Sequence, residues 1–477
     1  MKTSRKAHGA TPDAAQRAVR AQVAGDRPTA VAAWRDVLAR RSKDATAHDA
    51  LARLLVADDL AEAAVHALAA WQAAPGNGEY AANAWQLFTH MGEAGEVERF
   101  RRRVAERNDC VGLIGLGNAL RRSGEAVRAE RTYREALARF PEVSFTLSRL
   151  ACLCAEQHRL DEADALFQAA AGRHGGRDVV TRTAPSFLAA LQAGPAAPGQ
   201  TIRLAEGPRF ASRPILVYVS CDAGYFRLFG PSMIRSVATD SGLDAGICLH
   251  VVNPDGETEA MMRATAAAHD IGRFALISEQ VDLAPLGAQA KTYYACSRFL
   301  LLPDLLVRYR RPMLMLDIDL MAIRDLAPLL ATSAGADFGM MTNALKRLDI
   351  WSLLYADVVH ISPTQRAVDF LDLVRRYIGH FLKPGTAHWF LDQAALAGAF
   401  LAGHGTEAAP RFVWYPTDIH SSTVMVDADG RYWTDDSAYF YSVRATGGGQ
   451  KSLDRLKRRA GTIAELRALQ PALFAGG

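Results

Sequence analysis

The sequence predicts two kinds of fold in one chain, an all-α domain followed by an α/β domain. In the first half, which is rich in Ala, Leu, Arg and Glu, apolar residues recur at helical spacing. In the second half, β-branched and aromatic runs alternate with helical segments, which favours an α/β domain with a mixed, mainly parallel sheet. Between them lies a stretch rich in Pro and Gly, as linkers are. We therefore expect a helical domain at residues 1–185, a linker at 186–212 and an α/β domain at 213–477.

Length and composition fit a large globular protein of ordinary charge. Of the 477 residues, 49% are hydrophobic and 22% charged, which excludes a wholly disordered chain. The formal charge of +4 is mild for this length and gives no reason to expect a nucleic acid or a membrane surface as a partner. Because no run approaches the ~18 apolar residues of a transmembrane helix, we expect no membrane span.

Cysteine usage and the N-terminus favour a cytoplasmic location. The six cysteines have neither zinc-site spacing nor the density of a disulfide framework, so we expect free, buried thiols in a reducing compartment. The first residues are basic, but no apolar segment follows them, which argues against a secretory signal. We expect a cytoplasmic protein.

The helical half contains a repeat of two positions four residues apart, typically a small residue and then a large one. The copies, 33 or 34 residues apart, are Ala30/Trp34, Ala63/Ala67, Glu96/Phe100, Ala129/Tyr133 and Ala163/Phe167. A small residue lets two helices approach closely, and the large one fills the space toward the next pair.

One copy resembles the tetratricopeptide consensus, whose period is about 34 residues. Its matching residues are Leu116, Gly117, Leu120, Ala129, Tyr133, Ala136 and Pro141. The resemblance implies a superhelix of stacked helix pairs with a groove for a protein or peptide partner. The alternative is an unrelated Ala-rich helical bundle.

The α/β half is predicted to alternate strands and helices. Apolar runs with β-branched residues read as strands, and longer amphipathic runs read as helices. The expected strands end at Asp222, or cover 246–252, 274–278 and 312–319, and the expected helices cover 229–237, 257–270 and 291–309.

The run PMLMLDID places two carboxylates, Asp317 and Asp319, at the end of a buried strand. Side chains alternate along a strand, so we expect both carboxylates on one side. Ligands of open α/β sheets bind at the carboxyl ends of strands. Two adjacent carboxylates repel each other unless a cation neutralises them, which predicts Mn²⁺ or Mg²⁺ shared with a diphosphate. The same pattern at Asp427 and Asp429, just before Gly430, is expected to be a hairpin turn instead.

The stretch around that strand resembles the core of a GT-A glycosyltransferase, whose α/β domain is Rossmann-like. It is most similar to the retaining family 8 type, which includes lipooligosaccharide galactosyltransferases and glycogenin. The matching features are an arginine-bearing helix, the strand ending in Asp-x-Asp and a following Asp-Leu. They fall on Arg298, Asp317, Asp319, Asp325 and Leu326.

Further pieces match the same family in order and imply roles. Asp222 and Tyr225 correspond to residues that meet the nucleotide, and Asp392 and Gln393 to residues near the donor sugar. Lys451 matches the end of a closing motif, His-x-x-Gly-x-x-Lys, and with Arg298 would bind phosphate. The resemblance implies a UDP-sugar donor, a metal held by Asp317 and Asp319, and retention of anomeric configuration.

Two departures from the family pattern affect the expected site. Ala445 stands where the closing motif has its histidine, usually the third metal ligand. His420, from another loop, is an alternative ligand. Tyr355, Ala356 and Asp357 replace an Asn-Ser-Gly segment, so the contacts made there do not carry over.

Each candidate residue also has a structural interpretation. Asp222 and Asp392 could cap the helices that follow them, and Arg298 could lie on the surface of an amphipathic helix. Lys451 could be a solvated lysine in a Gly-rich turn. Trp389 and Trp414 are expected in the core or at a rim rather than under a sugar.

The function expected from these residues is metal-dependent transfer of a sugar to an acceptor recruited by the repeats. One alternative is a protein-binding scaffold whose transferase domain is degenerate, which the missing histidine favours. A haloacid-dehalogenase-type phosphatase also uses a strand ending in Asp-x-Asp. That class places Thr or Val where this chain has Met321, and its motif comes near the start of the domain.

Overall fold

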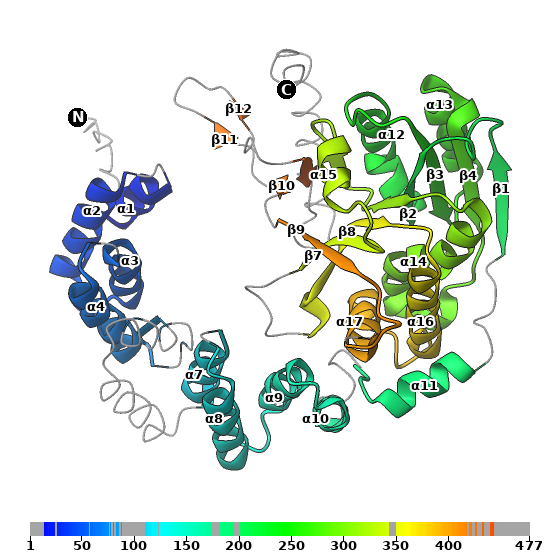
Figure 1. Cartoon of the computed structure of the whole chain (residues 1–477). Helices are drawn as coiled ribbons and strands as arrows, with labels where there is room; N and C mark the ends of the chain where they lie inside the picture. The colour runs from blue at the N-terminus through cyan, green and yellow to red at the C-terminus, as the bar shows by residue number, and fades with distance from the viewer. Residues whose placement is uncertain are drawn as a thin grey trace, which may run out of the picture. The chain divides into compact units, whose positions relative to one another are not determined.

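The computed structural model divides the chain into two compact units, Met1–Leu153 and Cys154–Gly477, which are described separately (Figure 1). The residues it describes are 14–23, 26–56, 58–75, 77, 80, 83–84, 87, 110–122, 124–173, 181–194, 201–342, 350–403, 405–416, 419–421, 425–426, 432–433 and 439–442. No helix among them is long and apolar enough to cross a membrane.

The first unit consists of helix pairs. In each of three pairs, two consecutive helices pack against each other: α1 (Ala14–Val23) with α2 (Arg27–Arg40), α3 (Ala45–Leu55) with α4 (Leu60–Ala73), and α7 (Cys110–Arg122) with α8 (Ala126–Arg139). α9 (Ser144–Glu156) follows. Asp26, Asp44 and Asp59 begin α2, α3 and α4, because each carboxylate accepts a hydrogen bond from a backbone N–H of the first turn, at 3.2, 2.9 and 2.8 Å. Local sequence therefore fixes where these helices start.

The repeated small and large residues lie at the buried faces of the second helix in each pair. They are buried at Ala30/Trp34 on α2, Ala63/Ala67 on α4, Ala129/Tyr133 on α8 and Ala163/Phe167 on α10 (Leu160–Arg173). The fifth pair, Glu96/Phe100, lies outside the described residues. The prediction of a helical repeat region is confirmed, because the ladder of residues read from the sequence is the set that fills the helix interfaces.

Tyr133 shows why the repeat needs a glycine on the preceding helix. Its ring is fully buried, and its hydroxyl donates a hydrogen bond to Asn118 Oδ1 at 2.7 Å. A Cβ atom at Gly117 would lie 2.4 Å from the Cε1 atom of that ring. The ring therefore occupies the space that a side chain at Gly117 would need.

The second unit begins with helices that are fastened to its α/β part. Asp164 on α10 is buried and accepts hydrogen bonds from the backbone N–H groups of Thr183 and Ala184, at 2.7 and 3.2 Å, and from Arg182 Nε at 2.9 Å. The backbone N–H of Arg182 donates to the hydroxyl of Tyr377, on α16 (Gln365–Phe381), at 2.7 Å. These bonds tie α10 to the α/β part, and the compact units divide before α10 rather than near residue 185.

The stretch expected to be a linker holds two regular elements. α11 (Pro185–Ala193) packs against α16 and α17 (Leu391–Gly403). β1 (Ile202–Glu206) pairs antiparallel with β4 (Phe274–Glu279) at the edge of the main sheet. The Pro- and Gly-rich composition therefore accompanies short elements that belong to the second unit.

The main sheet has eight strands in the order β1-β4-β3-β2-β5-β8-β7-β9. Four of its seven pairings are parallel (β4 with β3, β3 with β2, β2 with β5, β7 with β9), and β1, β8 and β7 supply the antiparallel ones. The remaining strands of this sheet are β2 (Ile215–Asp222), β3 (Ala245–Val252), β5 (Met313–Leu316), β7 (Phe338–Thr342), β8 (Leu354–Ile361) and β9 (Phe412–Tyr415). The mixed sheet agrees with the expected architecture.

Two smaller sheets complete the second unit. β6 (Leu320–Ala322), β13 (Phe440–Ser442) and β10 (His420–Ser421) form a three-stranded sheet. β11 (Met425–Val426) pairs antiparallel with β12 (Tyr432–Trp433), and the turn predicted at Asp427, Asp429 and Gly430 lies outside the described residues.

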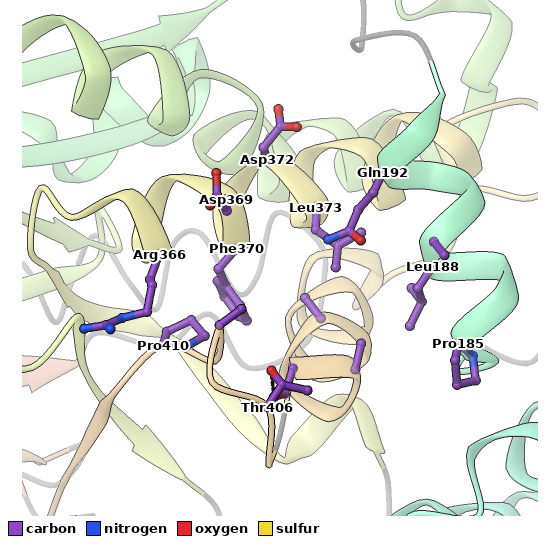
Figure 2. Close-up of a pocket in the computed structure, with 15 residues that line it drawn as sticks. Pro185, Leu188, Gln192, Arg366, Asp369, Phe370, Asp372, Leu373, Thr406 and Pro410 are labelled. Atoms are coloured by element: carbon purple, nitrogen blue, oxygen red, sulfur yellow. Dashed lines mark hydrogen bonds between the residues drawn. The ribbon is translucent and has the colours of Figure 1, made fainter.

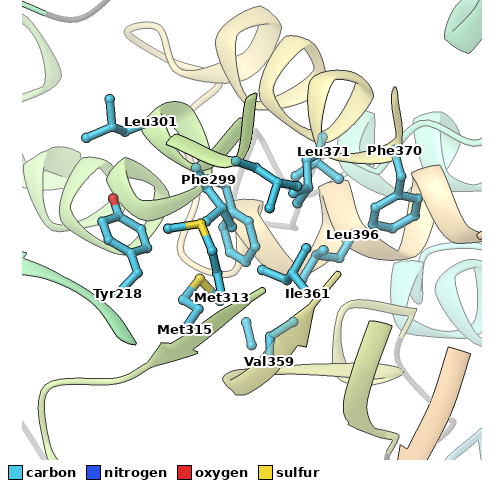
Figure 3. Packing of buried hydrophobic residues seen from close by; sticks show 14 of the residues in the cluster. Tyr218, Phe299, Leu301, Met313, Met315, Val359, Ile361, Phe370, Leu371 and Leu396 are labelled. Carbon is cyan, nitrogen blue, oxygen red and sulfur yellow. The ribbon is translucent and has the colours of Figure 1, made fainter. Parts of the chain in front are cut away.

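Helices cover both faces of the main sheet because strand side chains alternate. Leu216 and Tyr218 of β2 join a core with α14 (Ala290–Tyr309), α16 and α17 (Figure 3). Val217 and Val219 point to the opposite face and pack with residues of α12 (Ala223–Thr239) and α13 (Gly256–Ala268). α15 (Ala327–Thr332) follows β6. No disulfide joins any of the six cysteines; five are buried, as the sequence predicted, and Cys110 is half-buried.

Two element boundaries differ from the sequence prediction. α12 begins at Ala223 rather than at Phe229, because Asp222 caps it. β5 ends at Leu316, and residues 317–319 form a turn in which the N–H of Leu320 donates to the carbonyl of Asp317 at 3.1 Å. Both aspartates therefore lie in the turn after the strand, and the expectation that the strand itself carries them is wrong.

Replacing Gly117 by Ala should weaken the repeat. Tyr133 is buried and hydrogen-bonded, so it cannot move aside freely, and we expect the free energy of unfolding of the full chain to fall by about 1–3 kcal/mol. Urea denaturation measures this. Gly172→Ala on α10 is the matched control: its new Cβ meets nothing within 4 Å in the described part of the chain, so stability should hold or rise by up to about 1 kcal/mol. Equal losses in both variants would contradict the packing argument.

Acid should destabilise the second unit through His360 on β8. Burial lowers the pKa of this imidazole to about 4, whereas an unfolded histidine titrates near 6.5. The unfolded chain therefore binds the proton first, and stability is lost as the pH falls from 6.5 toward 4, by up to about 3 kcal/mol. Guanidinium denaturation at several pH values, with His360→Gln as comparison, measures the effect. If the difference in free energy of unfolding between the parent chain and His360→Gln did not narrow at low pH, the prediction would be contradicted.

Candidate functional site

The candidate site lies between β2 and β5, where the order of the strands along the main sheet reverses. From β2 the parallel strands β3 and β4 follow on one side, and β5 lies on the other. α12 follows β2 on one face of the sheet, and α14 leads into β5 from the other face, which opens a crevice at the carboxyl ends of these two strands. Asp222 ends β2, and Asp317 follows directly after β5.

A pocket of about 420 Å³ opens at this point. Its walls come from the end of β2 and the start of α12, one side of α14, the turn after β5, and the start of α17. The lining residues are Ser220, Cys221, Asp222, Tyr225, Lys291, Tyr294, Ala295, Arg298, Asp317, Ile318, Asp319, Trp389, Phe390, Asp392 and Gln393. The seven described residues to which the sequence analysis assigned a role at the site, Asp222, Tyr225, Arg298, Asp317, Asp319, Asp392 and Gln393, are all in this set. Lys451, Ala445 and the side chain of His420 lie outside the described part of the chain.

Asp222 both caps a helix and faces the pocket. Its Oδ1 accepts hydrogen bonds from the backbone N–H groups of Gly224 and Tyr225, at 2.7 and 3.0 Å. Burial raises the pKa of the Tyr225 hydroxyl, and the nearby carboxylates of Asp319 and Asp222 raise it further. Burial and the Asp222 carboxylate raise the pKa of Tyr294 in the same direction. Both phenols therefore stay protonated at neutral pH and can donate hydrogen bonds into the pocket.

Arg298 joins three walls of the pocket. Its Nη1 donates to Asp317 Oδ1, and its Nη2 donates to Asp392 Oδ2 at 2.9 Å. The guanidinium is largely buried, and the Asp392 carboxylate almost fully so. Of the alternatives that the sequence left open, the surface position of Arg298 is therefore wrong. Asp392 lies within the first turn of α17 and faces Arg298 rather than serving as the residue that begins the helix.

The turn that carries the paired aspartates is anchored to the neighbouring strand. The backbone N–H of Asp317 donates to the carbonyl of Asp357, on β8, at 2.9 Å. Ile318 between the two aspartates is buried, which fixes the turn from beneath. Both carboxylates line the pocket as a result.

The pocket carries more negative than positive charge. Four carboxylates (Asp222, Asp317, Asp319 and Asp392) face two cations (Lys291 and Arg298), an excess of two negative charges by formal count. No group of three His, Cys, Asp or Glu side chains that could hold a metal ion occurs in the described residues. Asp317 and Asp319 nevertheless supply hard oxygen ligands, and the charge excess favours a divalent cation, so these residues fit Mn²⁺ or Mg²⁺ with further ligands from a bound phosphate or water.

A buried polar network supports the pocket from behind. Ser220 lies 2.8 Å from Ser297 on α14, measured between hydroxyl oxygens, and 3.0 Å from Nδ1 of His250 on β3. His250 Nε2 in turn lies 3.0 Å from Glu279 Oε2 at the end of β4. The hydroxyl of Tyr293, on α14, donates a hydrogen bond to the same carboxylate. The network links three adjacent strands to the helix that carries Arg298.

The lining residues to which the sequence analysis gave no role as ligand contacts include Lys291, Tyr294, Trp389 and Phe390. Lys291 and Tyr294 lie on α14 about two turns and one turn before Arg298, so helical spacing from Arg298 could have found them. Trp389 and Phe390 precede α17, and only the three-dimensional structure shows which surface they face.

A second hollow, of about 580 Å³, lies between α11, α16 and the end of α17 (Figure 2). Its floor is largely apolar, with Leu188, Phe370 and Leu373. The charged side chains that line it have partners within the unit: Arg366 pairs with Asp337, Asp369 accepts from Gln365, and Asp372 pairs with Arg375 and Arg376. The convergent charged groups of the first pocket make that pocket the better candidate site.

Comparisons with known proteins find tetratricopeptide proteins as structural neighbours. No protein-family model matches the chain, and no curated protein matches its sequence. Solved structures that align with about a third of the chain include YrrB, a TPR protein with an unusual peptide-binding site (17% identity, 33% of this chain and 82% of that chain, TM-score 0.21). Others are the type IV pilus biogenesis factor PilW (19%, 35% and 79%, TM-score 0.24) and a thermophilic TPR protein, TTC0263, of Thermus thermophilus (18%, 33% and 87%, TM-score 0.22).

Removing the Arg298 side chain should destabilise the second unit strongly. Arg298→Ala leaves Asp392 as a buried, unpaired carboxylate, so we expect a loss of about 3–5 kcal/mol in the free energy of unfolding. Adding Asp392→Asn should restore part of the loss, because it removes the uncompensated charge. Arg263→Ala breaks an exposed ion pair with Glu259 and should cost less than about 1 kcal/mol. Chemical denaturation of the three variants measures these changes. Similar losses in the free energy of unfolding for Arg298→Ala and Arg263→Ala would contradict the buried role given to Arg298.

Proposed function

We propose that the chain is a metal-dependent glycosyltransferase of the GT-A type, most similar to family 8, fused to tetratricopeptide-like repeats. One observation carries the proposal. Seven residues that match the family motifs, from four segments far apart in the sequence, line a single pocket at the carboxyl ends of β2 and β5: Asp222, Tyr225, Arg298, Asp317, Asp319, Asp392 and Gln393. Chance motif matches would not be expected to converge in this way.

The proposed donor is a nucleotide sugar, with UDP as its nucleotide. Asp222 and Tyr225 would seat the nucleotide, and Asp317 and Asp319 would hold Mn²⁺ or Mg²⁺ against its diphosphate. The ion, when bound, would neutralise charge that develops on the leaving diphosphate. Lys451 would add a cation to the phosphates, and Asp392 and Gln393 would face the donor sugar. Because Arg298 is held by two carboxylates, we assign it the task of holding Asp317 and Asp392 apart and oriented, with a phosphate contact as a further role.

The proposed partner of the repeat region is a protein or peptide, either the acceptor itself or a factor that recruits it. Stacked helix pairs present extended surfaces of this kind. Six cysteines that form no disulfide, five of them buried, support a reducing, cytoplasmic setting for this function.

A second candidate is a protein-binding scaffold whose transferase-like domain has lost activity. The repeat pairs of the first unit and Ala445 in the place of a histidine favour it. The two candidates differ in one measurable property, since only the enzyme needs metal-dependent binding of a nucleotide in the pocket.

Calorimetric titration of UDP into the full chain, with Mn²⁺ or with EDTA, tests the proposal. We expect binding that depends on the metal and is lost in Asp317→Ala/Asp319→Ala, because both proposed oxygen ligands are removed. A matched control is Asp244→Ala/Asp304→Ala, which removes two exposed carboxylates outside the pocket and should bind UDP as the parent does.

Two results would contradict the proposed enzymatic function. They are the absence of UDP binding under either condition, and binding that the Asp317→Ala/Asp319→Ala variant retains. Either result would leave the scaffold as the better account. UDP binding that is unchanged by EDTA would remove the metal from the proposal.

A further inference from the structure

We infer that the mouth of the pocket is a carbohydrate-binding surface on which the ring of a neutral sugar acceptor stacks against Trp389. The inference deepens the proposed function, since it rests on that function and names the class of acceptor for the same pocket. It is carried by the exposed aromatic side chains, the backbone that presents them, and the polar groups around them.

Exposed aromatic side chains gather at this pocket. Among the described residues, five large aromatic side chains are exposed: Phe145, Tyr225, Trp389, Phe390 and Trp414. Three of the five line the pocket, with exposed fractions of 37% for Tyr225, 44% for Trp389 and 39% for Phe390. Leaving three such rings in water around one cavity forgoes hydrophobic stabilisation, which is typical of a surface that a ligand covers.

The backbone at Phe390 is held in a conformation that bulky residues avoid. Its φ is +74°, in the left-handed region that disfavours side chains larger than glycine by about 1–2 kcal/mol. This bend lies directly before α17, so Asp392 enters the helix and reaches Arg298 while Trp389 and Phe390 stay at the mouth. The strain is maintained because it places both aromatic rings beside the pocket.

Lys291 orients the indole of Trp389. Its ammonium nitrogen lies 5.1 Å from the Trp389 ring centroid, and the Phe390 ring centroid lies 6.0 Å from the same centroid at an interplanar angle of 60°. An ammonium over one face attracts the ring electrostatically and limits its rotation. A ring restrained in this way loses little conformational freedom when a ligand stacks on it.

The chemistry of the mouth matches a neutral sugar. The negative face of an aromatic ring attracts the weakly positive C–H groups on the flat face of a pyranose. The Tyr294 hydroxyl, which has no part in the proposed donor site, can donate a hydrogen bond to a sugar hydroxyl and accept one from it. An acidic acceptor, unlike the donor diphosphate, would have no metal ion of its own to offset the pocket carboxylates.

A peptide acceptor fits the mouth less well. Extended peptides bind by pairing with a free strand edge, yet β2 and β5, whose ends form the pocket, are each paired on both sides. The pocket therefore offers side chains rather than a row of backbone donors and acceptors. Side-chain recognition by an aromatic platform and a phenol hydroxyl favours a sugar.

Saturation-transfer NMR on the full chain tests the inference without measuring activity. The probes are methyl glycosides of glucose, galactose, mannose and N-acetylglucosamine, with maltose and lactose, each in the presence and absence of UDP and Mn²⁺. We expect at least one probe to bind, Trp389→Ala to weaken its binding about tenfold, and Trp389→Tyr to retain most of it.

The matched control is Trp414→Ala, which removes an equally exposed indole (41%) outside the pocket and should bind the probe as the parent does. Lys291→Met leaves Trp389 in place but frees its ring, and should weaken binding less than Trp389→Ala does. Failure of every probe to bind, or equal binding by Trp389→Ala and the parent, would overturn the inference. So would binding confined to a Ser- and Thr-containing peptide.

The outcomes separate this inference from the proposed function. UDP binding without sugar binding would support the donor site and contradict the carbohydrate-binding surface. Sugar binding that needs Trp389, in a chain that does not bind UDP, would support the surface and contradict the proposed transferase.

Discussion

One buried guanidinium holds the candidate site together. Arg298 on α14 meets Asp317, just after β5, and Asp392, in the first turn of α17, so three segments far apart in the sequence share a single cation. Without it, two carboxylates would face each other in a largely buried place, where repulsion is weakly screened. Arg298 therefore fixes the positions of three pocket walls relative to one another. The planar fork of arginine suits the task, because it can donate to two carboxylates in different directions.

The surroundings of Arg298 are rigid on one side and open on the other. Behind it, Ser220, Ser297 and His250 connect α14 to β2 and β3 through a largely buried network that ends on Glu279. In front, the side chains that face the pocket mouth are exposed rings. A site built in this way keeps its charged groups in fixed positions while its outer surface can be covered by a ligand. The division follows from strand alternation, since Tyr218 points into the core under α14 and the residues at the ends of the strands reach the crevice.

Sequence patterns predicted the elements well and the contacts between them poorly. The spacing of Ala129 and Tyr133 identified the helix interface, because such packing is set by local periodicity. The family resemblance selected Asp222, Arg298 and Asp392, yet it said nothing about Arg298 pairing with two other segments, which depends on how distant parts of the chain fold together. The turn at Asp317 was missed because an apolar run continues smoothly into it. The left-handed backbone at Phe390 was missed because nothing in the sequence Trp-Phe-Leu-Asp marks a conformation that usually belongs to glycine.

A short stretch of chain, from Trp389 to Asp392, connects the outer part of the pocket to its inner part. Asp392 follows Phe390 by two residues and Trp389 by three, so the ion pair that fixes Asp392 also fixes where the strained bend can lie. Asp317, the other partner of Arg298, is one of the two carboxylates proposed to hold a divalent cation. A cation held by Asp317, as proposed, would compete with Arg298 for that carboxylate. The acidic interior and the aromatic mouth therefore meet at Arg298, whose second partner, Asp392, lies two residues after the left-handed bend at Phe390.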